Sequence, residues 1–230
     1  MIDIYAASYA GSMHNGQNQD RAAICGTVLK CGKLHLHFDP GSELVTVAVC
    51  DGVGGEADGE FAAQYVTSQV AQKNNDISVE TLTDINRDFL ACAEQVGAGS
   101  MATTLAVLTV MNDSAVVRWS GNSRIYASCG ERYLQQITRD HTVSDTPDSP
   151  ITSCMGGGDE SLFRLSAERL NSLPSRFLLT TDGVHNFIEH IEMQSIVFKT
   201  PPERVCNALL ESATSNGSVD DKTAVLIVLT

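Results

Sequence analysis

Two short apolar runs, each ending in an Asp-Gly pair, constrain most strongly what this chain can fold into. Leu44–Cys50 ends at Asp51-Gly52, and Phe177–Thr181 ends at Asp182-Gly183. An Asp-Gly pair commonly forms the turn of a β-hairpin, but neither pair here is followed by a partner strand. Each run therefore predicts a buried strand that presents a carboxylate at its end, beside a glycine that would let backbone and a bound cation approach closely.

The hydrophobic pattern along the rest of the chain alternates blocks of strands with helices. Strands paired in hairpins, with helices laid over them, indicate an α+β layered sandwich and not a doubly wound parallel sheet. A helix that begins after a capping serine, Ser78, carries apolar residues three or four positions apart. The predicted strands are 2–9, 22–27, 33–38, 44–50, 104–111, 114–120, 125–129, 133–137, 177–181 and 223–229, and the predicted helices are 56–73, 78–96 and 202–214.

Composition excludes several classes of protein. The 43% of apolar residues is enough for a substantial core, and the lack of linkers or repeats predicts one domain over residues 1–230. The formal charge of −13 would repel a phosphate backbone, so we expect no nucleic-acid partner. The apolar runs are too short to cross a membrane, and no leader pattern follows Met1. We therefore expect a cytoplasmic monomer.

Two further acidic sites accompany the two Asp-Gly pairs. Asp220-Asp221 precedes the last strand, and Asn18-Gln19-Asp20 lies in the first loop after the opening strand. A solvated acidic surface would explain most carboxylates of such a chain, whereas these few stand at strand ends. Oxygen ligands of this kind suit Mg²⁺ or Mn²⁺ far better than zinc or copper. We expect the four sites to line one cleft.

These residues belong to a set of motifs that resembles the metal-dependent protein phosphatases of type 2C, in the same order and over nearly the whole chain. Any one of the motifs is common by chance, but seven in order are specific. The resemblance implies a four-layer α-β-β-α sandwich with two central antiparallel sheets flanked by helix pairs. The matching motifs are Asn18-Gln19-Asp20, Asp51–Gly55, Gly99–Thr104, Gly121–Arg124, Thr138–His141, Leu178–Gly183 and Asp220–Thr223.

The resemblance also implies a mechanism. Asp51 would bridge two divalent cations, Mn²⁺ or Mg²⁺, and Gly52 would lend a backbone carbonyl. Asp182 and Asp220 would bind one cation, and Asp20 would hold metal-bound waters. A water bridging the two cations would then attack a phosphoserine or phosphothreonine of a protein substrate, without a phosphoenzyme. By family analogy, such an enzyme opposes a serine/threonine kinase in a signalling circuit.

Several departures from the family pattern affect this interpretation. Relatives hold a third, weaker cation with two aspartates that are Asn122 and Asn186 here, so we expect the third site to be weak or absent. An arginine that binds substrate phosphate is replaced by His14, a low-ranking candidate for that role. The histidine that serves as general acid in many eukaryotic relatives is Val53. The flap beside the cleft, between His141 and Ile151, is short.

Alternatives to an active protein phosphatase remain open. A catalytically weak or silent pseudophosphatase that binds phosphoproteins would explain the two asparagines and the missing arginine. Hydrolysis of a small phosphoester would use the same metals and differ only in the substrate surface. A covalent cysteine phosphatase is excluded, because none of the seven cysteines has an arginine six residues later.

Overall fold

The computed structural model describes residues 1–39, 44–53, 56–147 and 149–230. Two antiparallel six-stranded sheets form its centre. The first has the order β11 (Tyr133–Gln136), β10 (Arg124–Cys129), β14 (Arg176–Thr180), β15 (Lys222–Leu229), β1 (Ile2–Tyr9) and β4 (Gly32–Phe38). The second has the order β13 (Ser166–Leu170), β9 (Ala115–Ser120), β8 (Leu105–Val110), β5 (Val45–Cys50), β2 (Arg21–Ile24) and β3 (Thr27–Leu29).

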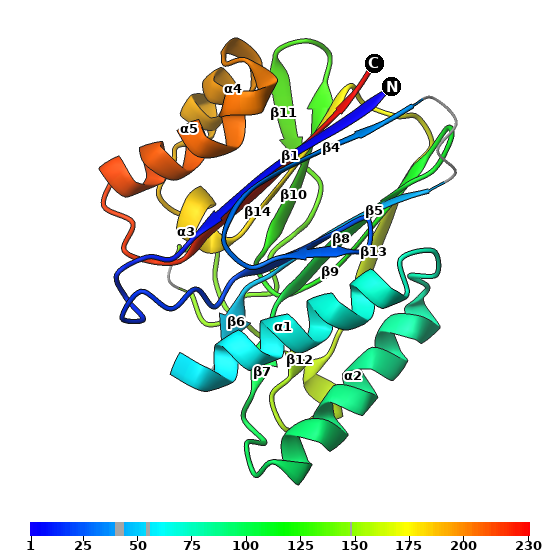
Figure 1. Cartoon of the computed structure of the whole chain (residues 1–230), viewed down its shortest axis with the longest axis vertical. Helices are drawn as coiled ribbons and strands as arrows, with labels where there is room; N and C mark the ends of the chain where they lie inside the picture. The colour runs from blue at the N-terminus through cyan, green and yellow to red at the C-terminus, as the bar shows by residue number, and fades with distance from the viewer. Residues whose placement is uncertain (40–43, 54–55, 148) are drawn as a thin grey trace.

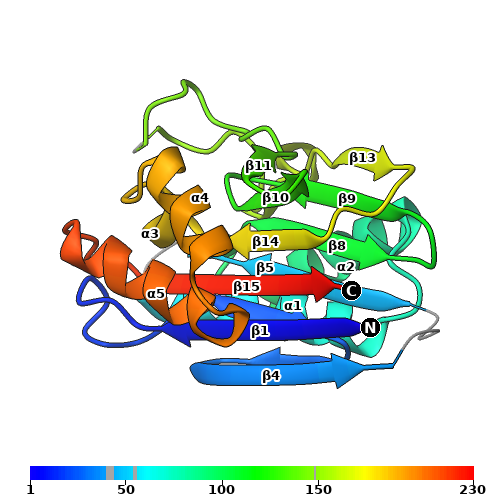
Figure 2. The ribbon, with the colours of Figure 1, turned by 90° about the horizontal axis from the view of Figure 1, so that it is seen from above.

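Helices cover the outer face of each sheet (Figure 1). On the first sheet lie α3 (Asp182–His185), α4 (His190–Lys199) and α5 (Pro202–Ser215), and on the second lie α1 (Glu56–Gln72) and α2 (Val79–Gln95). Figure 2, turned by 90°, shows α4 and α5 resting across β14, β15 and β1. A small sheet of β12 (Met155–Gly156), β7 (Ala102–Thr103) and β6 (Gly52–Val53), and a 3-10 turn at Glu160–Leu162, complete the chain.

The four layers enclose three apolar cores. One lies between the two sheets, a second joins α1 and α2 to the second sheet, and a third joins the helices of the C-terminal half to the first sheet. Because both faces of β5 are covered, all six of its residues are buried. The edge strand β4 alternates half-buried and exposed residues, as a strand with one wet face does. The predicted α+β sandwich of four layers is therefore confirmed.

Most predicted elements match the structure, but one predicted strand differs and several elements were not predicted. Ser78 accepts a hydrogen bond from Thr81 N over 3.1 Å as the N-cap of α2. The strand expected over residues 22–27 is instead a hairpin of β2 and β3, because Cys25 and Gly26 both have positive φ and reverse the chain. The sequence did not predict β13 or the helices α3 and α4.

The two strands that carry the Asp-Gly pairs occupy inner positions in different sheets. β5 lies between β8 and β2, and β14 lies between β10 and β15. Their C-terminal ends meet at one end of the sandwich, where Asp51 and Asp182 interact. No helix in the described part of the chain combines the length and the apolar character needed to cross a membrane.

Candidate metal centre

The structure brings the four predicted aspartates into one cluster. Asp51, Asp182 and Asp220 line a cleft of about 370 Å³, and Asp20 lies buried behind them, close enough to interact with Asp51 and Asp182. Burial raises the pKa of Asp51 well above its ordinary value, and the negative charges of Asp182, Asp20 and Asp220 raise it further. The carboxylates thus repel one another in a poorly solvated place, which is costly unless a positive charge joins them.

Two oxygens of this cluster are left without partners. Asp20 Oδ1 and Asp182 Oδ1 are buried and accept no hydrogen bond from any described residue. A buried carboxylate oxygen without a partner loses its hydration and gains no hydrogen bond, which costs free energy. Hard divalent cations bind to such oxygens, and the cluster offers carboxylates only, without sulfur or imidazole among its four members. The residues therefore fit the pair of Mn²⁺ or Mg²⁺ ions that the sequence predicted.

Hydrogen bonds hold Asp51 at the end of β5. The backbone N–H of Asp51 donates to Thr104 Oγ1 over 3.0 Å, and the Asp51 carbonyl accepts from Thr104 N and from Thr103 Oγ1, each over 2.9 Å. Thr104 Oγ1 in turn lies 2.8 Å from Ser123 Oγ. The Gly99–Thr104 motif thus positions Asp51, a predicted metal ligand. Gly54 and Gly55, which complete the Asp51 motif, lie outside the described residues.

The glycine that follows each aspartate is required for a packing reason that the sequence did not reveal. A Cβ on Gly52 would lie 2.1 Å from the carbonyl oxygen of Gly59 in α1. A Cβ on Gly183 would lie 1.9 Å from the carbonyl oxygen of Asp221. Both distances are far below van der Waals contact, so each glycine lets a second backbone segment pass directly beside the metal centre.

Asp221 has a role that sequence reasoning missed, since only its neighbour Asp220 was given one. It is buried, and its carboxylate accepts hydrogen bonds of 2.8 Å from Gly11 N and from Gln19 N. His14 Nδ1 lies 3.3 Å from the same carboxylate. Asp221 therefore fastens the first loop to the start of β15. His14 lines the cleft, and one of its ring nitrogens is engaged in this contact. Its contact with a substrate phosphate stays a prediction.

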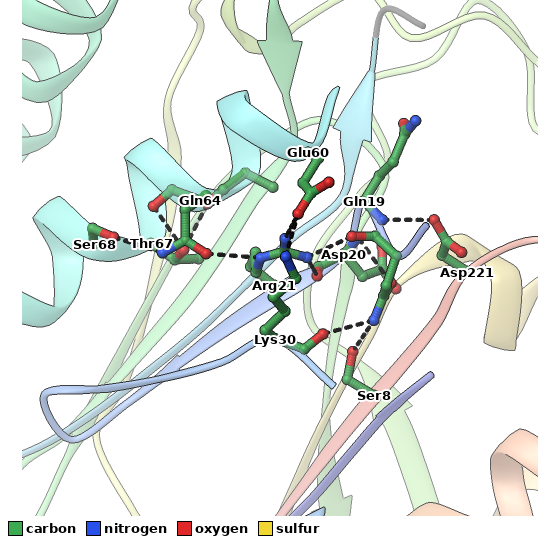
Figure 3. A network of polar contacts seen from close by, with 12 residues as sticks. Ser8, Gln19, Asp20, Arg21, Lys30, Glu60, Gln64, Thr67, Ser68 and Asp221 are labelled. Atoms are coloured by element: carbon green, nitrogen blue, oxygen red, sulfur yellow. Dashed lines mark hydrogen bonds and ion pairs between the residues drawn. The ribbon is translucent and has the colours of Figure 1, made fainter. Parts of the chain in front are cut away.

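Arg21 is a second residue that the sequence did not single out (Figure 3). Its side chain is 0% exposed, and Nη1 donates to the carbonyl oxygens of Asn18, over 2.5 Å, and Asp20, over 2.6 Å. Nη2 pairs with Glu60 over 2.7 Å, and Nε donates to Gln64 over 2.9 Å. Arg21 thus ties the backbone on either side of Gln19 to α1 and places a buried positive charge behind the carboxylates.

Thr181 joins Asp20 to the other sheet. Its hydroxyl donates to Asp20 Oδ2 over 2.7 Å, and its Oγ1 accepts from the backbone N–H of Thr223 over 3.0 Å. Since Thr181 directly precedes Asp182, one hydroxyl links the loop before β2, the end of β14 and the start of β15. Asp20 therefore presents its free Oδ1 in a fixed orientation.

Both asparagines at the expected third-cation positions use their amide nitrogens as donors. Asn122 Nδ2 donates to Asp182 Oδ2 over 3.0 Å, and Asn186 Nδ2 donates to the carbonyl oxygen of Pro147 over 2.9 Å. A carboxylate could make neither bond. Among the described residues that line the cleft there is no lysine or arginine, so no permanent positive charge on that wall is available to grip a phosphate.

Comparisons with known proteins agree with this fold. The chain is 26% identical over 209 residues to the protein phosphatase PhpP of Streptococcus pneumoniae, covering 79% of this chain and 84% of that protein. A bacterial serine phosphatase superposes with a TM-score of 0.80 at 22% identity, over 99% of this chain and 97% of that one. The serine/threonine phosphatase Stp1 from Staphylococcus aureus gives 0.79 at 23% identity, over 100% and 96%. No family model matches the chain.

The fold, the cluster of aspartates and the sequence relatives together define a class. The chain is similar to the metal-dependent protein phosphatases of type 2C, as its motifs predicted. The curated relatives that it matches are protein phosphatases of Streptococcus pneumoniae.

Proposed function

We propose that this protein hydrolyses phosphoserine and phosphothreonine in proteins, with two divalent cations, Mn²⁺ or Mg²⁺, held by its aspartates. The observation that carries the proposal is the cluster of Asp20, Asp51, Asp182 and Asp220, in which two buried carboxylate oxygens have no partner among the described residues. A protein that only needed the fold would gain nothing from carboxylates that repel one another in this way. Its homology to named protein phosphatases supports the substrate class.

In this mechanism the residues of the chain hold and orient the reactants. Asp51, Asp182, Asp220 and the carbonyl of Gly52 would bind the cations, with Asp20 contacting them through water. Cations held there would make water a stronger nucleophile and would neutralise the charge that builds on the phosphoryl oxygens. Thr104 and Thr181 fix Asp51 and Asp20 by hydrogen bonds, so that the carboxylates need no reorganisation when substrate arrives.

A specific observation favours one alternative, a catalytically silent module that binds phosphoproteins. The cleft wall has no lysine or arginine among its described residues, and Asn122 is committed to Asp182. Weak phosphate binding would lower turnover without removing the cations. Activity remains the proposal, since the cation-binding carboxylates are all present.

The test compares metal-dependent turnover in the native chain with two substitutions, Asp51→Asn and Asp182→Asn. A phosphothreonine peptide is incubated with Mn²⁺, with and without a chelator, and phosphate release is measured. We expect turnover that the chelator abolishes and that falls by about a thousandfold or more in both variants. Asp113→Asn, an exposed aspartate in the hairpin between β8 and β9, is the matched control and should change nothing. A folded native chain that binds Mn²⁺ but releases no phosphate would favour the silent module.

Further aspects of function extend this proposal. We propose that the chain acts in the cytoplasm as a monomer with one domain over residues 1–230. Its substrates would be proteins phosphorylated by a serine/threonine kinase, and the phosphatase would oppose that kinase.

The short flap between His141 and Ile151 is closed by an isolated bridge between Thr142 and Ile151. Its residue Asp148 lies outside the described residues. Such a flap leaves substrate choice to surfaces beside the cleft.

A further inference from the structure

A second cavity, of about 730 Å³, adjoins the cleft. Pro147, Asn186 and Phe187 line both hollows. The hydrogen bond from Asn186 Nδ2 to the carbonyl oxygen of Pro147 joins two of these shared residues. A peptide whose phosphorylated residue enters the cleft can therefore place a neighbouring side chain in the second cavity.

The charge of this cavity is negative. Asp145, Glu189 and Glu192 line it, and Glu192 Oε1 accepts a hydrogen bond from Ser212 over 2.5 Å. Arg124 also lines the cavity and carries a permanent positive charge, but Asp140 neutralises that charge. It forms contacts of 3.0, 3.0 and 2.7 Å with the carboxylate of Asp140.

A buried histidine supplies an independent sign of a ligand. His185 lines the cavity and is 5% exposed, and its Nδ1 lies 2.9 Å from Thr180 Oγ1. Its Nε2 is buried and has no hydrogen-bond partner among the described residues. Burial lowers the pKa of His185 well below its ordinary value, and the nearby charge of Arg124 lowers it further, so the ring is neutral. Thr180 Oγ1 can accept a hydrogen bond from Nδ1 or donate one to it; in the tautomer with the proton on Nδ1, Nε2 is an acceptor that lacks a donor.

The two observations select the same chemistry. Carboxylates favour a positive charge, and Nε2, in the tautomer with the proton on Nδ1, favours an N–H donor. A lysine or arginine side chain provides both, and its aliphatic stem can pack on the ring of Phe187 and on Met193, which also line the cavity. A second phosphate or an acidic side chain would meet repulsion here.

We propose that this cavity is a specificity subsite for a basic side chain near the phosphorylated residue of the substrate protein. The proposal rests on the proposed function, because it assigns the cleft to the phosphorylated residue. It makes the protein selective for phosphorylation sites with a lysine or arginine close in sequence. Glu189 and Glu192 are then specificity-determining residues that do not touch the reacting atoms.

The test measures peptide binding separately from turnover. Fluorescent peptides carry a non-hydrolysable phosphonate analogue of phosphothreonine, with one arginine moved through the three positions on either side, and an all-alanine peptide is the reference. Affinity is measured by anisotropy with Mn²⁺ for the native chain and for Glu189→Gln/Glu192→Gln. The matched control is Glu94→Gln/Glu168→Gln, which removes two exposed charges from α2 and β13. Hydrolysis of p-nitrophenyl phosphate, which is too small to reach the second cavity, is measured in parallel.

We expect arginine at one or two positions to tighten binding by about fivefold or more, and this gain to disappear in Glu189→Gln/Glu192→Gln but not in the control pair. Hydrolysis of p-nitrophenyl phosphate should be unchanged in both double variants. Equal affinity for all peptides, or a gain that survives the Glu189 and Glu192 substitutions, would overturn the subsite. If the native chain does not hydrolyse p-nitrophenyl phosphate, that result counts against the proposed function. The peptide-binding data would still decide whether the subsite exists.

Discussion

Asn122 donates a hydrogen bond from its amide nitrogen to Asp182 Oδ2, over 3.0 Å, at the edge of the metal centre. The amide satisfies one oxygen of Asp182, while Oδ1 is buried and has no partner among the described residues. Asn122 is one of the two positions where we expect a third cation to bind weakly. Its neutral amide and its bond to Asp182 agree with that expectation, which stays a prediction.

The first prediction follows from this contact. Asn122→Asp replaces a donor with a second negative charge beside Asp182, so we expect the metal-free protein to lose about 1–3 kcal/mol of unfolding free energy. Combined with Asn186→Asp, it should add a Mn²⁺ site to those of the native chain in isothermal titration. Asn112→Asp, on the exposed hairpin, is the control and should add none. Three native sites of similar affinity would refute the idea that the third is weak.

The second prediction concerns Arg21. Arg21→Met removes all four polar contacts of the guanidinium and leaves the carbonyls of Asn18 and Asp20 without their donor. We expect a loss of about 3–5 kcal/mol in urea unfolding and a weaker affinity for Mn²⁺. Arg87→Met, which removes an exposed ion pair with Asp84, should cost less than about 1 kcal/mol. Equal losses in the two variants would show that Arg21 does not support the metal centre.

The third prediction concerns the glycine after Asp182. In Gly183→Ala the new methyl group would lie 1.9 Å from the carbonyl oxygen of Asp221, so β15 and α3 must move apart. We expect the protein to misfold or to lose most of its Mn²⁺ affinity, measured by circular dichroism and calorimetric titration. Gly99→Ala meets nothing within 4 Å and should leave both properties unchanged. A Gly183→Ala variant that binds Mn²⁺ normally would mean that the close approach is not needed.

The fourth prediction concerns repulsion within the cluster. Burial and the neighbouring carboxylates raise the pKa of Asp51, which means that its charge destabilises the metal-free protein at neutral pH. Without metal, Asp51→Asn should therefore be more stable than the native chain by about 1–2 kcal/mol. With saturating Mn²⁺ the order should reverse, because the variant loses a ligand. Thermal unfolding with and without chelator measures both, and Asp113→Asn should show no reversal.

The fifth prediction concerns pH and His185. Burial lowers the pKa of this side chain in the folded protein, whereas in the unfolded chain it titrates near 6.5. Below that pH the unfolded chain binds the extra proton, so the free energy of unfolding falls as the pH drops through 6.5. In metal-free protein, His185→Gln should flatten this dependence between pH 7.5 and 5, as measured by urea unfolding. The exposed His190→Gln variant should keep the native slope. An unchanged slope in His185→Gln would show that the histidine is not held neutral.

Much of the fold follows from local pattern. Strands such as β5 and β14 could be predicted because segments covered on both faces are largely apolar. The helix α2 could be predicted from its cap at Ser78 and its apolar stripe. The helix α4 escaped prediction because its apolar residues do not form one stripe: Ile191 is 76% exposed, while Met193 and Val197 are buried. The hairpin at Cys25-Gly26 was missed because Cys25 carries no turn signal in the sequence and Gly26 was taken as part of the strand 22–27.

The sequence by itself determined which aspartates form the cluster, since they stand at or beside strand ends and strand ends meet at one edge of a sandwich. Only the tertiary structure decided what holds them. Asp221 binds Gly11 and Gln19, some 200 residues earlier in the chain, and Arg21 reaches across to Glu60 in α1. Such partners share no local period, because they are chosen by how the two sheets and their helices pack and by the need to satisfy every buried charge.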